Sequence, residues 1–229
     1  MTESHSVRKH LSVDIDDYDE TIRRFIPGYE AMLAHAVGAV RSVTPGLVLD
    51  LGSGTGALSE ILLIPGDIPS VELLDIDPEM LEAARGRLAR FGWHARFRDQ
   101  SFLGELPSCD AMMASLSLHH IPQLVAKRAL YARIHDTLWG GGVFANADVA
   151  LPSDPDERKA AWQFWADHQV AQGFTEAEAW AHFEEWGRED TYFTLDEEVA
   201  ALTDAGFAVE IAWREGPMAV LVGRKSHGG

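Results

Sequence analysis

The sequence has few of the residues that build disulfide frameworks, and it has no long apolar run. Its single cysteine, Cys109, can form neither an internal disulfide nor a Cys-x-x-Cys metal or redox motif. No segment approaches the roughly 20 apolar residues of a membrane span, and residues 1–11 lack the apolar core of a signal peptide. These absences predict a cytoplasmic protein that makes no membrane contact.

Basic residues are also scarce, because 19 Lys and Arg stand against 36 Asp and Glu, for a formal charge of −17. An acidic surface repels phosphate backbones, so the composition disfavours nucleic acid as a partner. The excess is uneven: residues 150–216 hold sixteen acids and four bases. The same stretch contains five of the seven tryptophans: Trp162, Trp165, Trp180, Trp186 and Trp213. This shift in composition indicates an inserted lid within a single domain. One domain is also what a length of 229 residues predicts.

Strand-like apolar runs alternate with helical patterns, which is typical of βαβ units. A capping box, Thr194 to Glu197, marks the start of a late helix, and Gly206 marks its end. We therefore predict an α/β fold: a doubly wound, mostly parallel seven-stranded sheet with helices on both faces. The predicted strands are residues 47–51, 71–74, 95–98, 111–118, 143–149, 207–213 and 218–222.

A glycine-rich loop, residues 50–56, follows the first strand and opens a helix. Glycines let a ligand approach the backbone, and the helix N-terminus offers free N–H groups. Two ligands fit the spacing. Gly52-x-Gly54-x-x-Ala57, with Asp75 downstream, satisfies the dinucleotide fingerprint of a nicotinamide-dependent oxidoreductase. The carboxylate of Asp50 would instead repel a pyrophosphate and would favour a ligand with positive charge, such as S-adenosylmethionine (SAM).

The later segments resemble, in order, the motifs of the class I SAM-dependent methyltransferases. Residues 48–56 and 74–81 are similar to the first and second motifs, and residues 98–101, 109–120 and 138–142 to the later ones. This resemblance implies a Rossmann-like fold, SAM as cofactor and methyltransferase activity. It also implies that Asp75 takes the ribose hydroxyls, that Asp99 takes the adenine amino group, and that Ile76 and Met80 pack near the adenine. The residues predicted to bind the cofactor are Asp50, Gly52, Ser53, Gly54, Gly56, Asp75, Ile76, Met80, Asp99, Gln100, Ser115, Tyr18, Arg23 and Tyr29.

The last three of these lie in an arm, residues 18–29, that resembles a subgroup including the carboxy-S-adenosylmethionine synthases of tRNA modification. In that subgroup the arm folds over the cofactor. Those synthases replace the middle glycine of the first motif, whereas this chain keeps Gly52, Gly54 and Gly56. A standard SAM methyltransferase is therefore favoured. The expected division is an arm at 1–42, a cofactor-binding core at 43–149, a helical lid insertion at 150–193 and a final helix with two strands at 194–229.

His119 and His120 end the predicted fourth strand, near where an acceptor should enter. Neighbouring side chains of a strand point in different directions, so at most one should face a pocket, and we take His119 as the candidate general base. A structural histidine is the alternative. The ten histidines are scattered without ligand spacing, which predicts no metal.

The lid aromatics recur at helical spacing, which predicts two amphipathic helices with aromatic core faces. Alternatively, some rings cap a small acceptor, and the surrounding acids would then suit an amine.

The sequence thus predicts in-line methyl transfer from SAM to a small-molecule acceptor. The alternatives are an enzyme of the tRNA-modification type, an oxidoreductase, and a non-catalytic cofactor-binding protein. An RNA-modifying role rests on one cluster of basic residues: Arg85, Arg87, Arg90, Arg96 and Arg98. The identity of the acceptor and the oligomeric state stay open, a homodimer included.

Overall fold

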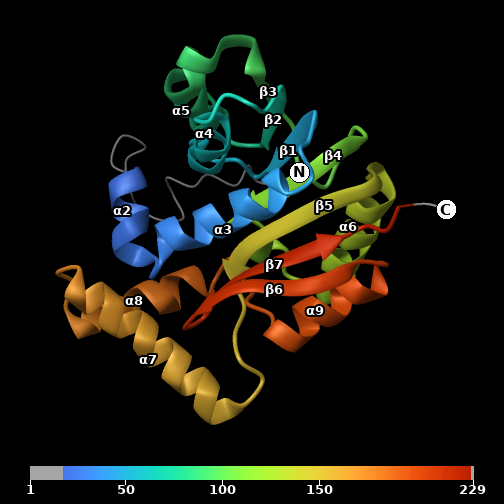
Figure 1. Cartoon of the computed structure of the whole chain (residues 1–229). Helices are drawn as coiled ribbons and strands as arrows, with labels where there is room; N and C mark the ends of the chain where they lie inside the picture. The colour runs from blue at the N-terminus through green and yellow to red at the C-terminus, as the bar shows by residue number, and fades with distance from the viewer. Residues whose placement is uncertain (1–17, 228–229) are drawn as a thin grey trace.

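A computed structural model describes residues 18–227, which form a layered α/β fold around one seven-stranded sheet (Figure 1). The strand order is β3-β2-β1-β4-β5-β7-β6. Strands β1 to β5 pair in parallel, and β7 lies antiparallel to both β5 and β6. The predicted fold class is thereby confirmed. The strands are β1 Leu47–Leu51, β2 Ser70–Asp75, β3 Ala95–Asp99, β4 Cys109–Ser115, β5 Leu138–Val149, β6 Ala208–Glu215 and β7 Met218–Arg224.

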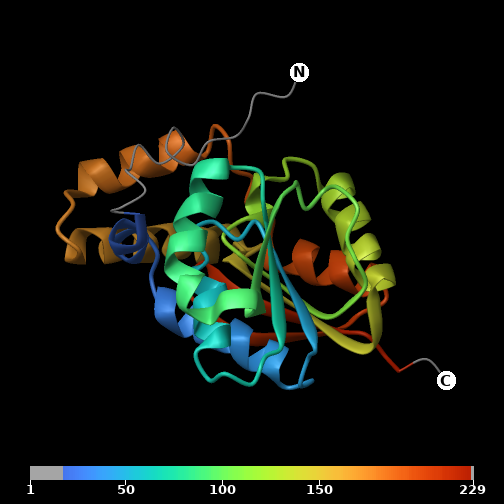
Figure 2. The same cartoon turned by 90° about the horizontal axis from the view of Figure 1, so that it is seen from above.

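Helices cover both faces of the sheet (Figure 2). Because successive strand residues face opposite sides, Val48 and Met113 pack with α3, α4 and α5 on one face. Leu49 and Met112 pack with α6 and α9 on the other. The helices are α2 Tyr18–Phe25, α3 Tyr29–Arg41, α4 Ala57–Leu63, α5 Pro78–Leu88, α6 Leu124–Thr137, α7 Pro155–Ala171, α8 Glu176–Trp186 and α9 Leu195–Asp204, with 3-10 turns η2 Ala89–His94 and η3 Leu118–His120.

Two predicted strand boundaries differ from the structure by more than two residues. The fourth strand was expected to reach residue 118 but ends at Ser115, because Leu116 adopts a left-handed backbone (φ 49°) and the chain turns into η3. The fifth strand begins at Leu138 instead of residue 143, because Leu138 already pairs with Cys109 across the sheet. The three glycines from Gly140 therefore lie within a strand.

The lid insertion between β5 and β6 begins with α7 and α8, and α2 lies beside them (Figures 1 and 2). Trp165 on α7 donates its indole N–H to the backbone oxygen of Phe25 at 2.6 Å. The Phe25 ring packs edge-on against Trp186 with centroids 5.1 Å apart. The two lid helices were predicted to bury aromatic faces, and α2 packs against part of those faces.

In the described part of the chain, no helix is both long enough and apolar enough to cross a membrane.

Candidate functional site

The glycine loop runs from the end of β1 to the start of α4. At Gly54 the backbone is left-handed (φ 53°), and a Cβ there would meet nothing within 4 Å, so the loop is open on that side. Gly56 (φ 81°) differs, because its Cβ would meet Ala84 and Leu88 at 3.2–3.3 Å. Gly54 thus leaves room for a ligand, and Gly56 lets α4 pack closely on α5.

Two carboxyl groups flank this loop. Asp75, at the end of β2, accepts the N–H of Gly54 at 2.8 Å and that of Asp77 at 2.9 Å. A carboxylate has about four acceptor positions, so two remain for a ligand. Asp50 is 1% exposed and accepts the Ser59 hydroxyl at 2.6 Å. Burial raises the pKa of Asp50 to about 7 and also raises that of Asp75.

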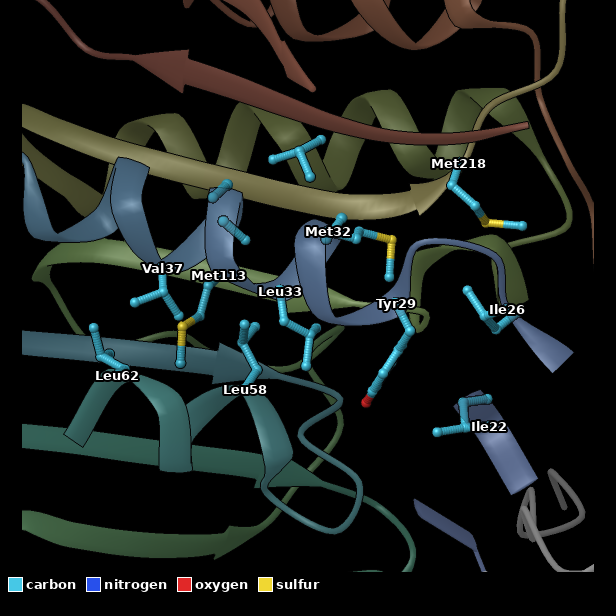
Figure 3. Close-up of a cluster of buried hydrophobic side chains, with 14 of the residues drawn as sticks. Ile22, Ile26, Tyr29, Met32, Leu33, Val37, Leu58, Leu62, Met113 and Met218 are labelled. Carbon is cyan, nitrogen blue, oxygen red and sulfur yellow. The ribbon is translucent and has the colours of Figure 1, made fainter. Parts of the chain in front are cut away.

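A cavity of about 370 Å³ joins the loop to the arm and the lid. Figure 3 shows Tyr29 projecting from the start of α3, with Ile22 and Ile26 of the arm beside it. Burial, and then the charge of Asp75, raise the pKa of Tyr18 to about 12, so its hydroxyl is neutral. The predicted site residues that line this cavity are Tyr18, Tyr29, Asp50, Gly52, Ser53, Gly54, Asp75, Ile76, Ser115 and His119.

Five predicted residues are not among the lining: Arg23, Gly56, Met80, Asp99 and Gln100. Arg23 pairs with Glu30 at 2.6 Å on the outside of the arm. Met80 is 1% exposed and packed within the fold. Asp99 is exposed at the end of β3, in register with Asp75. Gln100 donates to the backbone oxygen five residues on. Cofactor contacts by these residues stay predictions.

His119, on η3, also lines the cavity. Its Nδ1 is 2.6 Å from Oδ1 of Asp148 at the end of β5, and Asp148 Oδ2 accepts the backbone N–H groups of Leu118 and His119 at 3.1 Å. Burial opposes the charged imidazole, but Asp148 and Asp190 outweigh it and raise the pKa of His119. Because Nδ1 is committed to Asp148, Nε2 is the nitrogen left to take a proton.

A second carboxyl group, Asp190, lies between the two histidines. Its Oδ1 is 3.0 Å from Nδ1 of His120 and 3.7 Å from Nε2 of His119, and Oδ2 accepts the Tyr192 hydroxyl at 2.7 Å. Both imidazoles line the cavity, with ring centroids 4.3 Å apart. The expectation that at most one would face it was wrong, because these residues form a 3-10 turn and do not alternate as in a strand.

Sequence reasoning missed Asp148, Asp190 and Tyr192. Asp148 is the next-to-last residue of the buried strand β5, and Asp190 and Tyr192 lie in an irregular segment after α8, so no local motif marks any of them. The available signal was weak: an acid at the carboxyl end of the fifth strand, and an acid beside a tyrosine in an acidic lid.

Three potential metal ligands meet here. His119, His120 and Asp190 each place one ligand atom within 4.8 Å of the others. The sequence predicted no metal because the histidines lack ligand spacing, and the fold supplies the third group from about 70 residues away. Since these atoms already have partners within the cluster or at Asp148, the absence of a functional metal stays our prediction.

Comparisons with known proteins find similarity to methyltransferases. Residues 48–142 match a family described as a methyltransferase domain. A carboxy-S-adenosyl-L-methionine synthase of Nautilia profundicola is 22% identical over 214 residues, which cover 91% of this chain and 90% of that protein.

Solved structures share the fold. PigF, solved with S-adenosylhomocysteine (SAH), has a TM-score of 0.66 at 18% identity over 96% of this chain. Human N-acetylserotonin methyltransferase, solved with SAM, has a TM-score of 0.62 at 20% identity over 86% of this chain. This chain spans 62% and 52% of those two chains, which is less than two thirds of each. With its glycine loop, acidic strand ends and sheet order, the chain carries a SAM-dependent methyltransferase domain of class I.

Proposed function

We propose that the chain transfers the methyl group of SAM to a small-molecule acceptor bound in the same cavity, with His119 as the proton acceptor. The observation that carries this proposal is continuity: the glycine loop and His119 line one cavity of about 370 Å³. A donor held at the loop and an acceptor held at His119 would therefore share one space.

The lining at the loop fits the cofactor. The buried Ser53 hydroxyl has no hydrogen-bond partner among the described residues, Gly54 is open, and Asp75 keeps acceptor capacity. We assign Asp75 to the ribose hydroxyls and Asp50 to the ammonium group. Ile76 would pack on the adenine, and its 41% exposure is consistent with a surface that a ligand covers. Tyr18, Tyr29, Ser53, Gly52, Gly54 and Ser115 complete the proposed cofactor contacts.

At the other end, the chain's own groups position and deprotonate the acceptor. When bound, SAM supplies an electrophilic methyl carbon whose bond to sulfur breaks, with its electron pair staying on sulfur, as the acceptor atom bonds to that carbon. His119 Nε2 takes the proton that the acceptor atom loses. Asp148 holds the imidazole through Nδ1 and favours its charged form, as an orienting carboxylate does. Alignment and exclusion of water supply the rest of the rate.

The tRNA-modification alternative has one supporting observation, the likeness to carboxy-S-adenosyl-L-methionine synthase over 91% of the chain. The basic cluster that would attract RNA is largely neutralised, since Arg87 and Arg90 pair with Glu60, and Arg98 pairs with Glu72. Among the described lining residues there is also no Lys or Arg that would balance an added carboxylate on the cofactor. We therefore favour SAM itself as the methyl donor.

Calorimetric titration with SAH tests this proposal. The wild-type protein should bind SAH, and Asp75→Asn should weaken binding by about tenfold or more, because asparagine has one acceptor oxygen where aspartate has two. Asp136→Asn is the matched control, since Asp136 is 84% exposed and outside the cavity lining. Absence of SAH binding at millimolar concentration would end the proposal.

A further inference from the structure

The acceptor end of the cavity has aromatic and aliphatic walls. Phe25 of the arm, Trp165 and Trp186 of the lid, and Val149 at the end of β5 all line it. The rings of Trp165 and Trp186 lie 5.7 Å apart; Trp186 packs edge-on against the Phe25 ring, and Trp165 donates to the Phe25 backbone. These rings give the cavity an apolar aromatic wall against which a planar molecule can pack. The wall favours an acceptor with an apolar, planar body.

Most of the acidic charge of the lid lies outside this space. Of the ten acids between residues 150 and 193, the only one that lines the cavity is Asp190, and the other nine are exposed. The sequence suggested that acids around the lid aromatics would suit an amine. The structure gives that reasoning no support, because nine of the ten acids are exposed to solvent.

The two carboxylates nearest the acceptor are already engaged. Asp148 accepts the His119 imidazole and three backbone N–H groups, including that of Val149 at 2.8 Å. Asp190 accepts Tyr192 and pairs with His120. A cationic acceptor would have to displace these partners to gain a countercharge.

An anionic acceptor fits the cavity less well than a cationic one. No lysine or arginine is present among the described lining residues, so a carboxylate would be buried without a cation. Burying an ionised group without a partner is costly enough that the group stays in water or is neutralised.

The polar groups around His119 suit a neutral acceptor group that loses a proton during the reaction. His119 Nε2 is placed to take it, and the pKa of His119 is raised, so the imidazole is a stronger base than usual. An aromatic hydroxyl, with a pKa near 10, is within a few units of that base, whereas an aliphatic alcohol is far less acidic. Proton transfer is efficient when the two values are close.

We infer that the acceptor is an uncharged aromatic compound that presents a phenolic hydroxyl to His119, with its ring against Phe25, Trp165 and Trp186. This inference rests on the proposed function. It adds the substrate class: the hydroxyl loses its proton to His119 Nε2, and its oxygen receives the methyl group.

Three naphthalenes that differ in one substituent test the inference. The protein saturated with SAH is titrated calorimetrically with 2-naphthol, 2-naphthoate and 2-(aminomethyl)naphthalene, and transfer of labelled methyl from SAM is measured for each. We expect 2-naphthol to bind at least about tenfold more tightly than either charged analogue, because it is uncharged and needs no countercharge when it is buried. We also expect it to be the methylated compound.

A pair of lid variants locates the binding. Trp186→Phe should weaken 2-naphthol binding several-fold, and the matched Trp180→Phe should not, because Trp180 is 38% exposed and outside the lining. Tighter binding of the amine or the carboxylate, or binding of none of the three to a complex that holds SAH, overturns the inference while leaving the proposed function standing. Failure to bind SAH in the first place would remove both.

Discussion

At the scale of single residues, Asp50 has an environment that couples cofactor binding to pH. It is 1% exposed, and burial raises its pKa to about 7 although the Ser59 hydroxyl donates to it. The ammonium group of a methionine moiety would pair with the carboxylate form alone. In the free protein that form is the minor one below pH 7 and the major one above it.

SAH affinity should therefore be constant above pH 8 and fall below pH 7, by up to about tenfold per pH unit. Titration calorimetry between pH 5.5 and 8.5 measures this. Asp50→Asn should bind SAH more weakly and lose that pH dependence, which separates Asp50 from the neighbouring Asp75. A wild-type affinity that rises as the pH falls would contradict the assignment.

Local residues of the site could be predicted from sequence, and distant ones could not. The glycines and Asp75 are marked by their spacing after a strand, and ten of the fifteen predicted site residues line the cavity. Asp148 and Asp190 lie 29 and 71 positions after His119 in the chain, and only the packing of β5 and the lid brings them to it. Motif reasoning cannot find such partners because their placement is a property of tertiary structure.

At the scale of elements, the arm helix α2 bridges the glycine loop and the lid. Asp19 accepts the Thr55 hydroxyl at 2.8 Å and pairs with Arg87 of α5. On its other side, Arg24 donates to the backbone oxygen of Gln172, just after α7. The arm thus ties the cofactor end of the cavity to its acceptor end.

Removing the tie at Asp19 should let bound SAH escape faster. Asp19→Ala removes the partner of both Thr55 and Arg87, so we expect the SAH dissociation rate to rise about threefold to tenfold, the effect of losing one or two hydrogen bonds. Stopped-flow tryptophan fluorescence measures the rate. Glu20→Ala is the control, because Glu20 is exposed on the same helix. Equal dissociation rates for wild type and Asp19→Ala would show that the arm does not retain the cofactor.

The elements themselves were mostly predictable. Alternating apolar runs located the strands, and the capping box located the start of α9 at Thr194, which caps the helix as predicted. The turn after β4 was not predictable, because it depends on a left-handed leucine, Leu116, for which the sequence offers no glycine or asparagine. That turn is what brings both histidines to the cavity.

At the scale of the whole molecule, a buried ion pair lies on the opposite face of the sheet from the arm. Lys127 of α6 and Glu198 of α9 are each 1% exposed and paired, and the Tyr131 hydroxyl donates to Glu198 at 2.5 Å. The pair joins the two helices that cover this face. Breaking such a pair leaves one charge buried without compensation.

Lys127→Met should therefore lower the free energy of unfolding by about 3–5 kcal/mol, measured by urea denaturation. Arg128→Met is the matched control: the neighbouring Arg128 is 45% exposed and pairs with Asp204, so its loss should cost less than about 1 kcal/mol. Adding Glu198→Gln to Lys127→Met should restore part of the stability. Equal losses in the two single variants would mean that burial of the pair has no energetic consequence.

The central claim is that one cavity brings a methyl donor at the glycine loop to an acceptor at His119. Its most direct test is the transfer of labelled methyl from SAM to 2-naphthol by the wild type and by His119→Gln, with SAH affinity measured in parallel. Glutamine can still donate to Asp148 but cannot take the proton, so the rate should fall by about 100-fold or more while SAH affinity stays within about twofold. Because the pKa of His119 is raised and the neutral imidazole is the active form, the wild-type rate should increase with pH above about 6.5. A variant that transfers methyl at the wild-type rate would contradict the account.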